Sequence, residues 1–149
     1  MEVYLVRHTE TVCEKGICYG QSDVEIMAPY DAVFQSVLSQ LPQDANLYSS
    51  PLLRCVLLAN YIKDNSEINA VNEDSRLMEM NFGDWEMKNW NEIPAEEINP
   101  WYEDFVQTKT PNGESMQEMF DRLSHFMNEL RNSNYQHVLI AAHGGIIRL

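Results

Sequence analysis

The sequence predicts an α/β fold, namely a three-layer sandwich with a mostly parallel central sheet and helices on both faces. Apolar runs rich in β-branched and aromatic residues, at residues 3–6 and 138–142, are typical of buried strands. Strand-like and helix-like segments alternate between them, which is the pattern of a parallel α/β sheet. The length of 149 residues is that of one domain, so we expect residues 1–149 to form a single domain.

The first half of the chain is expected to hold two strands and two helices. After the first strand and a long polar loop, Pro29 begins a segment with apolar residues at helical spacing. These residues are Val33, Phe34, Val37, Leu38 and Leu41. A second strand is expected at residues 46–49. Ser50 and Pro51 then predict an N-cap and a first-turn proline for a helix that runs to about Ile62.

The second half contains an irregular segment, the clearest helix and the last strand. A short strand near residues 70–71 leads to a segment at about 85–113 that is rich in tryptophan and proline. We interpret that segment as a lid-like insertion of short helices. Ser115 and Glu118 form a capping box at the start of a long helix with one apolar stripe. The stripe comprises Met116, Met119, Phe120, Leu123, Phe126, Met127 and Leu130.

The net charge of −13 argues against several kinds of partner. Between Asp84 and Glu129, eleven acidic residues accompany three basic ones, and such a surface repels nucleic acids and anionic membranes. No apolar stretch approaches the ~20 residues of a membrane helix. Three cysteines without a Cys-x-x-Cys pair favour a reducing cytoplasm over a disulfide framework or a zinc site. We therefore expect a cytoplasmic protein with a small-molecule partner and with no metal or other cofactor.

Polar side chains follow directly on the two apolar strands. Arg7 and His8 end the first strand and His143 ends the last, and ligands bind at the carboxyl ends of strands in open α/β sheets. Arg54 falls in the first turn of its helix, where the helix dipole disfavours a cation unless an anion is held nearby. Glu79 lies among apolar neighbours, an environment that suits a proton donor. These residues predict an anion-binding site with a nucleophile.

Four segments resemble, in their order and spacing, the histidine phosphatase superfamily, also called phosphoglycerate mutase-like. The segments are Arg7–Thr11, Ser50–Arg54, Arg76–Glu86 and Ala142–Arg148, and the resemblance extends from residue 3 to residue 148. Within the superfamily, the short chain, the loop at 16–23 and the string at 80–83 most resemble α-ribazole phosphatases of cobalamin synthesis.

The resemblance implies a metal-independent phosphomonoester hydrolase that works through a phosphohistidine intermediate, with α-ribazole 5′-phosphate as its substrate. It implies that His8 is the nucleophile and that Glu79 protonates the leaving group. The groups expected to bind phosphoryl oxygens are Arg7, Arg54, His143 if its ring is protonated, and the amides of Gly144 and Gly145. The residues expected beside the leaving group are Tyr19, Gly20 and Gln21.

The sequence leaves two questions open: where Glu14, a departure from the family pattern, points, and whether either of two alternative functions applies. Glu14 stands where many members have an asparagine that contacts phosphate, so either the loop is realigned or Glu14 points away. The alternatives are a protein phosphohistidine phosphatase, which needs an open site, and a catalytically inactive binding relative. The aromatic residues of the insertion (Trp85, Trp90, Trp101 and Tyr102) favour a lid over a bulky apolar or aromatic leaving group.

The end of the sequence carries a further expectation. Residues 146–149 begin an apolar helix that stops after one turn, which is too short to be stable alone. We therefore expect a chain truncated at its C-terminal helix. An apolar patch left uncovered there would bind a hydrophobic dye or pair with a second copy as a homodimer.

Overall fold

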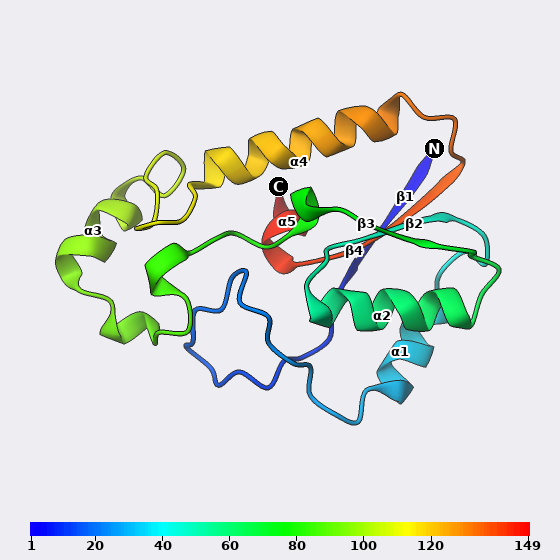
Figure 1. The fold of residues 1–149 in the computed structure, drawn as a ribbon, viewed down its shortest axis with the longest axis horizontal. Helices are drawn as coiled ribbons and strands as arrows, with labels where there is room; N and C mark the ends of the chain where they lie inside the picture. Colours follow the sequence, from blue (N-terminus) through cyan, green and yellow to red (C-terminus); the bar gives the residue numbers. More distant parts are fainter.

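A computed structural model describes residues 1–149 and contains a four-stranded parallel sheet (Figure 1). The strands are β1 (Glu2–Arg7), β2 (Asn46–Ser49), β3 (Val71–Glu73) and β4 (His137–Ala142), in the spatial order β1-β4-β2-β3. Because β4 lies between β1 and β2, the carboxyl ends of these three strands meet. The residues that follow them, His8, His143 and Ser50, therefore come together at one edge of the sheet.

Helices cover both faces of this sheet. Helices α1 (Asp31–Leu38) and α2 (Leu53–Asp64) lie on one face and α4 (Met116–Arg131) lies on the other (Figure 1). Side chains of β4 alternate between the two layers: Leu139 and Ala141 join the cluster under α1 and α2, whereas Val138, Ile140 and Ala142 join the cluster under α4. A central parallel strand is buried on both faces in this way. The predicted three-layer α/β sandwich is confirmed.

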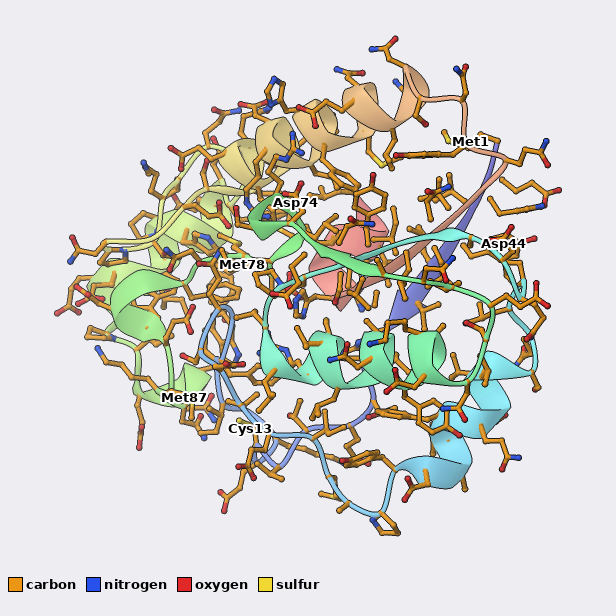
Figure 2. The ribbon with its side chains drawn as sticks, turned by 45° about the vertical axis from the view of Figure 1, so that its right-hand side comes forward. Met1, Cys13, Asp44, Asp74, Met78 and Met87 are labelled. Carbon is orange, nitrogen blue, oxygen red and sulfur yellow. The ribbon has the colours of Figure 1, made fainter.

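The segment between β3 and α4 forms a separate lobe beside the sheet, and it contains the predicted short helices. Helix α3 (Ala95–Glu103) and two 3-10 turns, Gly83–Trp85 and Trp90–Glu92, surround a small apolar core (Figure 1). That core includes Cys18, so the loop after β1 packs into the lobe. Figure 2 shows the loop that carries Cys13 near the part of the lobe that carries Met87. The two segments are joined by the amide of Cys18, which donates to the carbonyl of Lys88 at 2.9 Å.

The N-terminal cap of α4 is the one that the sequence predicts, whereas the cap of α2 is a different residue. Ser115 and Glu118 form the predicted capping box of α4. The prediction that Ser50 caps α2 is wrong, because α2 begins at Leu53 after Leu52 as its N-cap residue. The Leu53 amide donates instead to the carboxylate of Asp23 at 2.7 Å, while the Ser50 hydroxyl lies 2.7 Å from Nε2 of His143. A loop distant in the sequence therefore caps α2, and the Ser50 hydroxyl pairs with His143.

The short last helix, α5 (Gly144–Arg148), begins directly after β4. An apolar groove of about 490 Å³ lies between β1, α4 and α5, and its lining includes Leu5, Phe120 and Ile147. Leu5 and Phe120 are 49% and 45% exposed. None of the helices has the length and hydropathy that a membrane span requires.

Candidate active site

His8 lies at the carboxyl end of β1 and is 7% exposed. Its Nδ1 lies 2.7 Å from the carbonyl oxygen of Thr9, so Nδ1–H donates there and Nε2 carries the lone pair. Burial, with a smaller contribution from the nearby Arg54 and Arg7 charges, lowers the pKa of His8 to about 4. The ring is therefore neutral at pH 7 and held in the tautomer that a nucleophilic Nε2 requires.

His143 follows β4 and is fully buried, with its ring centroid 5.2 Å from that of His8. Nε of Arg54 donates to its Nδ1 at 3.2 Å, so the hydrogen on Nε2 points to the Ser50 hydroxyl at 2.7 Å. Burial and the charge of Arg54 lower the pKa of His143 to about 2. The contribution of His143 to phosphate binding was expected only from a protonated ring; here the ring is neutral, both nitrogens are engaged, and it orients Arg54.

Arg54 is fully buried at the start of α2. Its Nη1 donates to the carbonyl of Ser22 at 2.8 Å and its Nη2 to the carbonyl of Gly20 at 2.5 Å. The ring of Tyr19 lies over the guanidinium, with its centroid 5.2 Å from Cζ. Backbone carbonyls and an aromatic face therefore supply the negative partial charge that a cation in the first turn of a helix needs.

Arg7 and the two glycines after His143 lie beside this pair of histidines. Arg7 is exposed, and a Cβ on Gly144 would come 3.4 Å from its Cζ, so the guanidinium packs over the glycine backbone. The Gly145 amide donates to Glu79 Oε2 at 3.0 Å and is thus engaged by a protein group rather than free for phosphate. A Cβ on Gly145 would approach Glu79 Oε1 to 2.0 Å, so only glycine admits the carboxylate here.

Glu79 reaches this site from the start of the lobe segment, just after the 3-10 turn Ser75–Leu77 that follows β3. Its Oε1 accepts from the Met80 amide and its Oε2 from the Gly145 amide, each at 3.0 Å. Its backbone carbonyl accepts at 3.0 Å from Nε2 of Gln21 and at 3.0 Å from Nη2 of Arg122. The loop is therefore held on both sides, and Gln21, expected beside the leaving group, instead fixes Glu79.

A cavity of about 430 Å³ opens beside His8 and Glu79 and is walled by aromatic and methionine side chains. Trp90 and Trp101 stack with centroids 5.9 Å apart and form part of the wall together with Phe82 and Tyr19. Trp85 instead fills the core of the lobe. Tyr102 is 61% exposed and does not line the cavity. Of the four aromatic residues that were expected to form a lid, only Trp90 and Trp101 therefore line the cavity.

A second hollow, of about 440 Å³, adjoins His8 on the side of the loop after β1. Arg7, His8 and Tyr19 line both hollows, whereas Glu10 and Glu14 line only this second one. Glu14 is exposed there. Its carboxylate therefore lies near the site but at the polar hollow rather than in the aromatic cavity.

Four residues that support the site were not singled out from the sequence. Asp23 caps α2 and Ser22 accepts from Arg54 through its carbonyl. Arg122 on α4 holds the Glu79 loop and forms an ion pair with Glu114, with Nη2 and Oε1 2.6 Å apart. Glu86 binds the loop after β1. All four act between segments far apart in the sequence. Ser22 and Asp23 lie in the loop at 16–23 and Glu86 lies in the segment Arg76–Glu86, so the family resemblance offered a signal for these three but none for Arg122.

The two buried histidines predict a fold that loses stability on acidification. Their folded pKa values of about 4 and about 2 lie below the ~6.5 of an unfolded histidine, so the unfolded chain binds more protons as the pH falls. The stability contribution is fully present above pH ~6.5 and is lost progressively below it. Thermal melting between pH 7.5 and pH 4.5 should show a falling Tm. His143→Asn should reduce this slope, whereas His125→Asn, at an exposed position on α4, should not. Equal slopes in all three proteins would contradict the prediction.

Comparison with known proteins agrees with this geometry. The family model of the histidine phosphatase superfamily (branch 1) matches residues 3–149. "Putative phosphoserine phosphatase 2" of Hydrogenobacter thermophilus is 35% identical over 97% of this chain and 74% of that protein. The adenosylcobalamin/alpha-ribazole phosphatase of Escherichia coli strain K12 is 28% identical over 100% of this chain and 76% of that protein. The crystal structure of the alpha-ribazole phosphatase from Shigella flexneri superposes with a TM-score of 0.89 at 28% identity, covering 100% of this chain and 77% of that one. The chain therefore belongs to the histidine phosphatase superfamily.

Proposed function

We propose that this chain is a phosphomonoester hydrolase that forms a phosphohistidine on His8. The observation that carries the proposal is the neutral imidazole of His8, whose Nδ1 is held by Thr9 at the mouth of an aromatic cavity that also contains Glu79. A fixed tautomer places the lone pair on Nε2, and the cavity provides space for a leaving group on the side of the proposed proton donor.

The reaction then proceeds in two steps. Nε2 of His8 attacks the phosphorus in line, the bond to the ester oxygen breaks, and Glu79 delivers a proton to the leaving alkoxide. Arg7 and Arg54 stabilise the negative charge on the phosphoryl oxygens, Arg54 through the one N–H on each Nη that its bonds to the Ser22 and Gly20 carbonyls leave over. In the second step, Glu79 takes a proton from water, the water oxygen attacks phosphorus, and the bond to Nε2 breaks to release phosphate.

The wall of the cavity supports an apolar or aromatic leaving group. Trp90, Trp101 and Phe82 offer ring faces and edges, and Met116 and Met119 complete an apolar surface. Flat heteroaromatic groups bind such surfaces by stacking. We therefore propose α-ribazole 5′-phosphate, which carries a benzimidazole, as the substrate, with a role in building the nucleotide loop of cobalamin.

A kinetic panel tests the substrate. We expect kcat/KM for α-ribazole 5′-phosphate to exceed that for phosphoserine, 3-phosphoglycerate and simple sugar phosphates by at least about tenfold, because stacking contributes ~1 kcal/mol or more per aromatic pair. Trp101→Leu should reduce the preference, whereas Tyr102→Leu, at the neighbouring exposed position, should leave it unchanged. A higher kcat/KM for a phosphohistidine-containing protein would favour the alternative function instead, and equal values across the panel would contradict the substrate proposal.

A further inference from the structure

The carboxylate of Glu86, a half-buried residue of the lobe, is surrounded by hydrogen-bond donors. Its Oε1 accepts from the amides of Gln21 at 2.7 Å and Phe82 at 3.2 Å. Its Oε2 accepts from the amide of Ser22 at 2.6 Å and also from the Ser22 hydroxyl. The ion pairs of the structure do not include Glu86. Its negative charge is therefore stabilised by the loop after β1.

The same loop binds Arg54 from its other side. The peptide group between Gly20 and Gln21 donates its N–H to Glu86 and accepts with its C=O from Nη2 of Arg54. In a trans peptide the N–H and C=O point in opposite directions, so a carboxylate and a guanidinium lie on opposite sides of one peptide plane. Charges at the two ends polarise the peptide and strengthen both hydrogen bonds.

The close approach of this peptide to Glu86 depends on glycine. Gly20 has φ +25°, and a Cβ there would come 2.5 Å from Glu86 Oε1 and 2.4 Å from the carbonyl oxygen of Met80. Any larger side chain would push the loop away from the carboxylate. Ser22 gives a second link, through two successive peptide groups: its amide donates to Glu86 and its carbonyl accepts from Nη1 of Arg54.

We propose that Glu86 is a positioning residue that aims Arg54 at the phosphoryl group through the loop at 20–22. The proposal rests on the proposed function, in which Arg54 binds phosphate. Glu86 does not line the aromatic cavity or the polar hollow, so it acts through the loop and not by contact with the substrate. A glutamine in its place has one oxygen acceptor, so its NH2 group would face either the Ser22 amide, which now donates to Oε2, or the Gln21 and Phe82 amides, which now donate to Oε1.

Phosphate affinity tests this role independently of turnover. We expect Glu86→Gln to weaken the binding of inorganic phosphate, measured by calorimetry, about tenfold, which corresponds to ~1.4 kcal/mol. The matched control is Glu97→Gln in the same lobe, where the carboxylate accepts from Nε1 of Trp85 and does not touch the loop. This control should bind phosphate as the unmodified protein does. Ser22→Ala removes only the hydroxyl donor and should weaken binding by a smaller factor, about twofold to threefold.

A double-mutant cycle separates positioning from general destabilisation. Lys at position 54 keeps the positive charge but cannot reach both carbonyls in the same way. In the Arg54→Lys background, Glu86→Gln should therefore cost less than about twofold in phosphate affinity. An equal cost in both backgrounds, or unchanged affinity in Glu86→Gln, would overturn the proposal. If the unmodified protein binds no phosphate, the proposed function fails, and the positioning role fails with it.

Discussion

Replacement of His8 by alanine is expected to abolish phosphatase activity, because the phosphoryl group then has no ring nitrogen to bond to. Loss of a covalent nucleophile costs a factor on the order of 10⁴ or more in turnover. His8 is buried but makes only one side-chain hydrogen bond, to the Thr9 carbonyl, so the fold should survive. Turnover of p-nitrophenyl phosphate and thermal melting, measured on the same sample, would test both statements.

Two further variants and a labelling experiment make the test specific. His8→Asn keeps a polar side chain near the Thr9 carbonyl but has no nucleophilic ring nitrogen, so it should be as inactive as the alanine variant. His125→Ala, at an exposed position on α4, should remain active. Unmodified protein quenched during turnover of a ³²P-labelled substrate should carry acid-labile label that the His8 variants lack. Full activity in His8→Ala would disprove the mechanism.

Glu79→Gln is expected to slow the hydrolysis of alkyl phosphates far more than that of p-nitrophenyl phosphate. An alkoxide leaving group needs a proton, whereas nitrophenolate leaves without one, and general acid catalysis contributes ~10²–10⁴ in rate. Glutamine can still accept the Gly145 or Met80 amide, so the loop should keep its place. The ratio of kcat/KM for an alkyl phosphate to that for p-nitrophenyl phosphate is the quantity to measure.

Asp84→Asn provides the matched control for that ratio. Asp84 is an exposed acid five residues further along, and its carboxylate accepts from the side-chain amide of Asn112 outside the site. The ratio should stay unchanged in this variant. If Glu79→Gln instead reduced both substrates equally, Glu79 would have a binding or structural role and the proton donor would have to be sought elsewhere.

Local patterns predicted most of the fold because each depends on neighbours in the sequence. The runs at 3–6, 46–49 and 138–142 lie in strands, and the capping box at Ser115 starts α4. Leu41 lies beyond the end of α1 at Leu38, since apolar spacing marks a buried face but not the last helical turn. Ser50 is not the cap, because α2 begins three residues later at Leu53; the Ser50 hydroxyl accepts from the Leu52 amide and pairs with His143, a partner 93 residues away.

The candidate site was predictable in its residues but not in their partners. His8, Arg54, Glu79 and His143 meet because parallel strands and their loops converge at one sheet edge, a rule that holds for the whole fold class. Nothing in the local sequence indicated that Nη2 of Arg54 donates a hydrogen bond to the Gly20 carbonyl. Loop-to-loop hydrogen bonds of this kind depend on how segments fold back, and no periodicity encodes them.

The pairing of β1 with β4 also governs when the protein can fold. Residues 2–7 pair with residues 137–142, so β1 cannot take its place in the sheet until β4, which follows the other three strands along the chain, has been made. Contacts between such distant parts of a chain slow folding, since a long loop must close before they form. During synthesis, the early segments therefore emerge from the ribosome with their apolar faces unpaired and exposed to aggregation or chaperones. His8 and His143 come together only when β1 has paired with β4, so a partly folded chain lacks the site.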